Sequence, residues 1–104
     1  MRISKEEKDG CAYVKIEGEF SIYEASTLRN EFLECFNNYN GLILDLSNVT
    51  ECDTAGIQLL CSARLTAENE EKIFSVDKMA EPVVNALISG GLAPEKIKYH
   101  KEEV

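Results

Sequence analysis

The segment Asp53-Thr54-Ala55-Gly56 places a carboxylate, a hydroxyl and a glycine where a strand-like run gives way to a helical pattern. Asp53 is typical of a helix N-cap, whose carboxylate accepts a backbone N–H and complements the helix dipole. Thr54 would then be the first helical residue, beside free N–H groups that favour an anion. A phosphate there would add roughly −1.5 to −2 charges and would clash with a protein docked on that end of the helix. The spacing is compatible with a structural threonine, a nucleophile or a phosphate acceptor.

Gly56 is unexpected inside a helix, where glycine costs about 1 kcal/mol relative to alanine. A glycine beside a hydroxyl at a helix start permits close approach by another part of the backbone or by a partner surface. The glycine therefore indicates a close contact at this end of the helix.

Other catalytic chemistry has few residues available to it. The one histidine, His100, lies four residues from the end of the chain and has no visible partners for a Ser/His/Asp triad or a His-rich metal site. The usual glycine-rich phosphate loops are absent. Asp45 and Asp53 could be imagined as an acid and base pair, but Asp45 fits better as a turn or strand-end residue. We predict no enzyme activity, no catalytic residue, no metal site and no cofactor.

The four cysteines lie in apolar patterns and form no CxxC pair. In a reducing compartment such cysteines are free, largely buried thiols that pack as small hydrophobes. We predict this state for all of them: Cys11, Cys35, Cys52 and Cys61.

The whole chain has the composition of one globular domain, predicted to span residues 1–104, with 44% hydrophobic and 29% charged residues. Its net charge of −8 argues against nucleic acid or an anionic membrane as the main partner, since both attract basic surfaces. No apolar stretch is long enough to insert into a membrane, and the N-terminus lacks the apolar region of a signal peptide. A cytoplasmic location is expected.

Hydrophobic periodicity predicts an α/β domain in the order β-β-α-β-α-β-α-β. Ser21 and Glu24 have the spacing of a capping box at the first helix, and residues 47–50 are typical of a turn. The arrangement predicts a mixed sheet of about four to five strands with helices packed on it. Strands are expected at 2–7, 11–18, 42–46, 72–76 and 96–100, and helices at 21–39, 54–69 and 81–91.

Three segments carry a resemblance to a known family: "VKIEGEF", "LILDLSNVTECDTAGIQLL" and "EPVVNALISGGL". Together they resemble the STAS domain, named for sulfate transporters and anti-sigma-factor antagonists. The resemblance implies a bacterial, non-catalytic domain whose best-known members bind a serine-kinase anti-sigma factor and so regulate transcription. In those members, phosphorylation of the hydroxyl residue after the signature aspartate blocks binding, and a phosphatase restores it. Thr54 occupies that position here.

The resemblance also implies a partner-binding surface on the signature, formed by Asp53, Thr54, Ala55, Gly56, Ile57 and Gln58. Two residues depart from the usual antagonist pattern, which has serine at the position of Thr54 and a small residue, often glycine, at that of Gln58. The leading interpretation is a regulatory signalling domain switched at Thr54 by a partner kinase and phosphatase. The alternative is a constitutive subunit of a lipid-transport ABC transporter or chemotaxis assembly, with no phosphate cycle.

Overall fold

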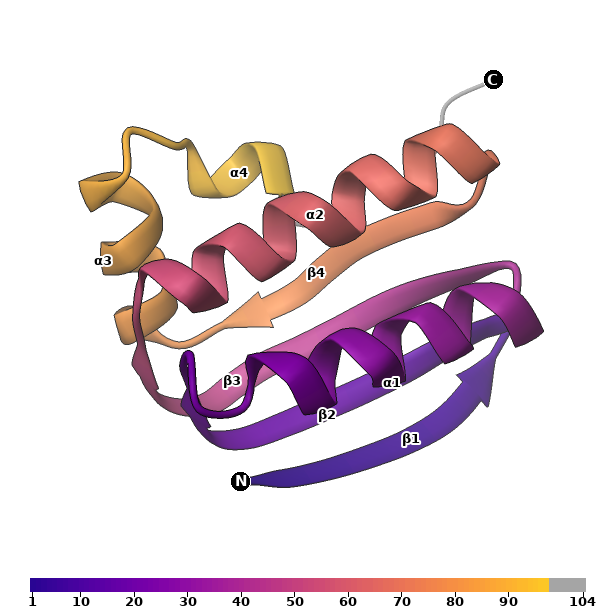
Figure 1. Ribbon diagram of the computed structural model, residues 1–104, viewed down its shortest axis with the longest axis horizontal. Helices are drawn as coiled ribbons and strands as arrows, with labels where there is room; N and C mark the ends of the chain where they lie inside the picture. Colours follow the sequence, from indigo (N-terminus) through magenta and orange to yellow (C-terminus); the bar gives the residue numbers. More distant parts are fainter. Residues whose placement is uncertain (98–104) are drawn as a thin grey trace.

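The computed structural model describes residues 1–97, except for the side chains of residues 95 and 96. The chain begins with two strands, after which helices and strands alternate through three longer helices to a final four-residue helix (Figure 1). The elements are β1 (Arg2–Lys8), β2 (Cys11–Phe20), α1 (Ala25–Asn38), β3 (Gly41–Cys52), α2 (Thr54–Glu70), β4 (Ile73–Met79), α3 (Glu81–Ser89) and α4 (Pro94–Ile97).

The strands form one mixed sheet in the order β1-β2-β3-β4. β1 and β2 are an antiparallel hairpin, whereas β2, β3 and β4 run parallel. Parallel neighbours need crossover connections, and α1 and α2 supply them. Both helices start at the same end of the sheet and lie side by side on one face (Figure 1). The predicted mixed α/β architecture is confirmed.

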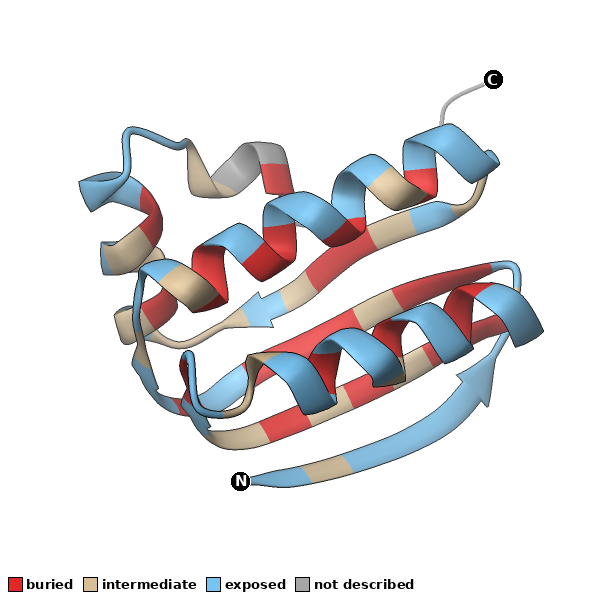
Figure 2. Cartoon of the chain, in the orientation of Figure 1, coloured by how far each residue is buried: buried red, intermediate tan, exposed pale blue. Residues whose placement is uncertain are grey.

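The hydrophobic core lies between this helical layer and the sheet (Figure 2). Alternation along β2 sends Ala12, Val14 and Ile16 into the core, where all three are fully buried. The residues between them, Tyr13 and Lys15, are half-buried. α1 contributes its own apolar stripe at helical spacing, as expected: Leu28, Phe32, Cys35 and Phe36.

Both central strands are longer than the sequence indicates, and the predicted turn at residues 47–50 is wrong. β3 continues to Cys52, with Val49 3% exposed and paired with Gly18 of β2. Gly18 itself, expected to end β2, has a φ of +104° and lies between two irregularities in the register. The glycine accommodates the irregular backbone, and the strand runs on to Phe20.

The capping box predicted from Ser21 and Glu24 does not form. α1 begins at Ala25, Glu24 makes no side-chain cap bond, and the buried Ser21 Oγ has no hydrogen-bond partner among the described residues. Residues 21–24 form a turn instead, in which Glu24 N–H donates to the Ser21 carbonyl at 3.0 Å. The cause is a contact with a distant residue: the Asp53 carboxylate accepts the Ile22 N–H and holds this segment in the turn, so that α1 starts later.

The last predicted strand, residues 96–100, is wrong in its first two positions, which belong to α4. Pro94 is suited to the first turn of a helix, and Ile97 is buried in the core. The remainder of that predicted strand, with His100, lies outside the described residues.

Candidate functional site

Asp53 ties two segments of the chain together at the start of α2. Its backbone is extended, and Oδ1 accepts the Gly56 N–H at 3.0 Å, which makes it the N-cap that the sequence predicts. Oδ2 accepts the Ile22 N–H at 3.1 Å, thirty-one positions earlier in the sequence. One carboxylate therefore fixes both the start of α2 and the turn that precedes α1.

Gly56 is explained by the close approach of α2 to the end of β2. A Cβ at this position would lie 2.5 Å from the Phe20 carbonyl oxygen, 2.9 Å from the Phe20 ring and 3.2 Å from the Cys52 sulfur. The backbone oxygen cannot move cheaply, so only glycine fits. The close contact indicated by the sequence is thus made within the chain.

The six predicted partner-binding residues divide by exposure. Asp53, Thr54 and Gln58 are exposed and Ala55 is half-buried, whereas Gly56 and Ile57 are buried. Gly56 and Ile57 therefore pack beneath the surface.

Two hollows flank the first turns of α2. One, of about 360 Å³, lies between α2 and α3 and is lined by Asp53, Thr54, Ser89 and Gly90 among others. The other, of about 500 Å³, lies between α1 and α2 and is lined by Ala55 and Gln58. Thr54 and Gln58, although four residues apart, therefore border different hollows.

Two apolar residues beside Asp53 are exposed, which the sequence analysis does not predict. Ile22 is 63% exposed and Tyr23 is 86% exposed. The helix predicted at residues 21–39 includes both, but both lie in the turn before α1. Their place in the "SIYE" segment directly after a strand is the one signal that could have indicated an exposed turn.

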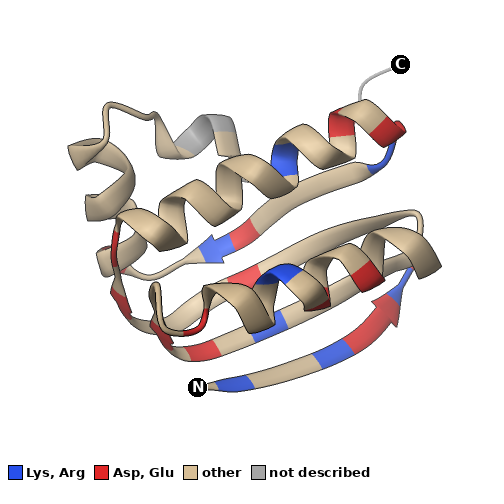
Figure 3. Ribbon diagram, viewed as in Figure 1, with Lys and Arg blue, Asp and Glu red and all other residues tan. Residues whose placement is uncertain are grey.

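The surroundings of Thr54 are acidic. Glu19 and Glu51 are paired across β2 and β3, an unfavourable arrangement of like charges. No lysine or arginine occurs in residues 16–28 or 49–63, although Arg2, paired with Glu17, and the Met1 amino terminus beside Gly18 bring positive charge next to the first of these segments. Figure 3 shows acidic segments at the ends of β2 and β3. These carboxylates disfavour a further anion at Thr54, whereas the helix dipole of α2 favours one there.

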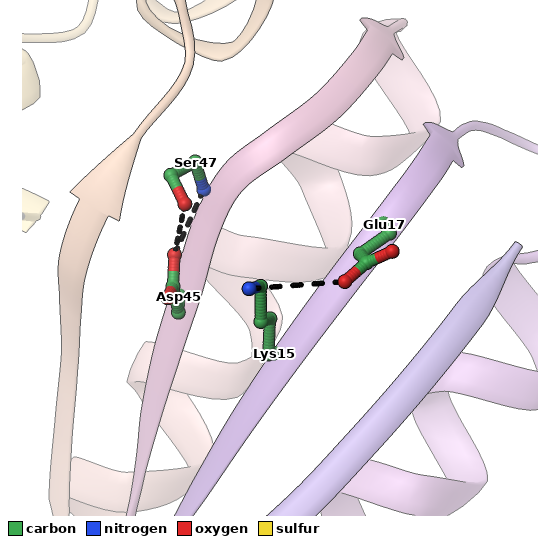
Figure 4. A network of polar contacts seen from close by, with 4 residues as sticks. All are labelled: Lys15, Glu17, Asp45 and Ser47. Carbon is green, nitrogen blue, oxygen red and sulfur yellow. Dashed lines mark hydrogen bonds and ion pairs between the residues drawn. The ribbon is translucent and has the colours of Figure 1, made fainter.

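Asp45 lies in the middle of β3, which contradicts the turn or strand-end position expected for it. Its carboxylate accepts both the N–H and the hydroxyl of Ser47, at 3.0 and 2.6 Å, while Lys15 pairs with Glu17 on the next strand (Figure 4). Burial raises the pKa of Asp45, but the Ser47 hydrogen bonds and the charges of Lys78 and Lys15 outweigh it and hold the pKa below its ordinary value.

Asp45 and Asp53 do not form an acid and base pair. Eight residues of extended chain separate them by about 25 Å, and each carboxylate has its own structural partners. Among residues 1–97, no cluster of three or more histidine, cysteine or acidic side chains is arranged to hold a metal ion.

The cysteines are free, as predicted, but not all are buried. Cys11 and Cys35 are buried, Cys52 is half-buried and Cys61 is exposed on α2. Burial and the neighbouring Asp53 raise the pKa of the Cys52 thiol to about 11. The expectation of burial therefore fails at Cys61.

The sheet, its helical layer and the Asp53 cap define a STAS fold. An anti-sigma factor antagonist, SpoIIAA in its unphosphorylated form, has a similar structure: the TM-score is 0.76 at 13% identity, over 98% of this chain and 90% of that one. An anti-sigma factor antagonist from Mycobacterium paratuberculosis gives a TM-score of 0.72 at 22% identity, over 89% and 85%. These likenesses establish the fold.

Residues 3–94 match the family described as "Mlab, STAS domain", and the chain belongs to that family. No curated protein matches the sequence. Within the described residues, no helix has the length and apolar character needed to cross a membrane.

Proposed function

We propose that this chain is a non-catalytic protein-interaction domain in which the N-terminal end of α2 docks a partner protein. Phosphorylation of Thr54 by a partner kinase prevents docking, and a phosphatase restores it. The observation that carries the proposal is the exposed Thr54 directly after the Asp53 cap, on an end of the molecule with two open hollows. The likeness to two anti-sigma factor antagonists supports the same mode of action.

The phosphate acts through its bulk more than through its charge. The end of the molecule is already acidic, with Glu19, Glu51 and Asp53 exposed around Thr54. The charge of a phosphate leaves the sign of the local electrostatic potential unchanged. Its bulk, in contrast, fills space on the first turn of α2. A partner seated flush on that turn is displaced, and the free N–H groups at the helix start stabilise the phosphate that displaces it.

Mass spectrometry of the protein from its native cells tests the modification, with phosphate expected on Thr54. Binding measurements with the co-purifying partner test the effect. Thr54→Glu is expected to weaken binding at least tenfold, and the uncharged Thr54→Gln nearly as much. Thr27→Glu, on the exposed surface of α1, is the matched control and should bind normally. Equal affinity of Thr54→Glu and wild type removes the switch.

The family description "Mlab, STAS domain" favours a second candidate, a constitutive subunit of a lipid-transport ABC transporter. In that role Thr54 lies in a permanent interface and is never phosphorylated; a chemotaxis assembly would be a variant of the same role. Unmodified Thr54 in a stable complex purified from cells would support this candidate. The neighbouring genes, encoding a kinase, chemotaxis proteins or a transporter, discriminate further.

A further inference from the structure

A long groove lies between α1 and α2 on the surface turned away from the sheet. It consists of two adjoining hollows that share Arg29, Leu59 and Ser62. The first begins at Ile22, beside the Asp53 cap, and the second continues over Phe32 and Phe36 toward Thr66. We call these residues together the α1–α2 groove. The two helices start at the same end of the sheet (Figure 1), so the groove follows their length.

The groove has an apolar floor and a low rim. Leu59, Phe32 and Ala63 form the floor and are between 2% and 8% exposed. Most of the rim consists of small side chains, which leave room for a third helix to approach: Ala25, Ser26, Ala55, Ser62 and Thr66. The larger exposed side chains of Leu33 and Gln58 also line it and would contact that helix. The lining runs from Ala25 to Phe36 on α1, so the groove accommodates about 17 Å, or roughly three turns of a helix.

The charges along the groove specify the helix that fits. Arg29 lines both hollows, is exposed, and makes no ion pair with any described residue. At the Ile22 end the groove meets the carboxylate of Asp53, which accepts the Ile22 N–H. A complementary helix has an apolar stripe, a carboxylate that reaches Arg29, and a lysine or arginine at the end nearest Asp53.

We propose that the α1–α2 groove receives an amphipathic helix of the partner protein, with its basic end over Ile22 and Asp53. The inference rests on the proposed function in requiring a protein partner, but not on phosphorylation. A second copy of this chain is a poor occupant, because two chains that each carry a net charge of −8 repel one another. Gln58 then contacts the partner helix, while Thr54 borders the neighbouring hollow.

Three matched serine variants test the location. Ser62→Arg fills the α1–α2 groove, Ser89→Arg fills the hollow that Thr54 borders, and Ser4→Arg lies on β1. All three serines are exposed, and each change adds the same charge. Urea unfolding confirms that the fold persists, and Ser62→Ala controls for loss of the serine itself. The probe is the partner that co-purifies with the wild-type chain, purified and titrated against each variant.

We expect Ser62→Arg to weaken binding at least tenfold, with Ser4→Arg and Ser62→Ala within twofold of wild type. Hydrogen exchange should protect one segment of the partner, and a synthetic peptide of that segment should gain helicity on binding. If Ser62→Arg binds within twofold of wild type, the proposed binding of a partner helix in the groove is overturned. It is also overturned if the wild-type chain is a dimer and Ser62→Arg converts it to a monomer.

The failures of the two proposals are distinguishable. Loss of binding in Ser89→Arg alone overturns the groove but leaves a partner on the end of α2. Normal binding of Thr54→Glu together with lost binding of Ser62→Arg refutes the switch and supports the groove. Recovery of no protein partner with the wild-type chain overturns both.

Discussion

Asp53 gives the sharpest test of how the site is built, because one carboxylate makes two contacts of different kinds. Asp53→Ala removes the N-cap bond to Gly56 and the bond to Ile22. Loss of an N-cap costs about 1 kcal/mol. A typical additional hydrogen bond contributes about 1 kcal/mol, and less where it is exposed, as the bond to Ile22 is. The expected loss in the free energy of unfolding is therefore ~1.5–2 kcal/mol.

Urea unfolding of wild type, Asp53→Ala and Asp53→Ser separates the two contacts. Serine retains the cap but has one short oxygen, so it should recover about 1 kcal/mol and leave the Ile22 N–H unbound. Hydrogen exchange at the Ile22 amide should then be equally fast in both variants. A loss below ~0.5 kcal/mol in Asp53→Ala, outside the range for a helix cap, would refute the reasoning. So would slow exchange at Ile22 in either variant.

Three further predictions concern residues around the site. Gly56→Ala should destabilise by about 1–2 kcal/mol, since overpacking against Phe20 exceeds the gain in helix propensity; Gly90→Ala, whose Cβ would meet nothing closer than 3.5 Å, should be neutral or stabilising by urea unfolding. In native thiol labelling followed by mass spectrometry, exposed Cys61 should react first and Cys11 and Cys35 last; uniform rates would contradict the assigned burial. The lowered pKa of Asp45 means that its ionised form is favoured in the folded state, so its contribution is present above the ordinary pKa near 3.8 and is lost as pH falls through the lower folded value. The stability difference between wild type and Asp45→Asn should accordingly shrink on moving from pH ~7 to ~3, and a pH-independent difference would be inconsistent with the Ser47 hydrogen bonds.

Local patterns were sufficient to predict the sheet class, the helical layer and the Asp53 cap. The period-two alternation of β2 and the apolar run within β3 both lie in strands of the structure, and their apolar residues Val14, Ile16 and Leu44 are fully buried. The Asp53 cap is local too, since donor and acceptor are three residues apart. Such features follow from propensity and spacing and need no knowledge of distant contacts.

The features that could not be predicted depend on contacts between distant segments. Ser47 and Asn48 have turn propensity, yet they extend β3 because the end of β2 is available to pair with it, through Glu17 and Asn48 first. Ser21 and Glu24 have capping-box spacing, yet α1 starts later because Asp53 holds Ile22. Gly56 was recognised as a close contact, but its neighbour, Phe20, is thirty-six positions away in sequence. The division of Thr54 and Gln58 between two hollows likewise depends on where α1 and α3 pack.

The most direct test of the central claim uses protein with phosphothreonine installed at position 54 and the partner purified from native cells. Isothermal titration should give normal affinity for the unmodified chain and at least a hundredfold weaker affinity for the phosphorylated one. Circular dichroism should show the fold unchanged. Equal affinities of the two forms for the partner would contradict the account, because Thr54 would then lie outside the docking surface.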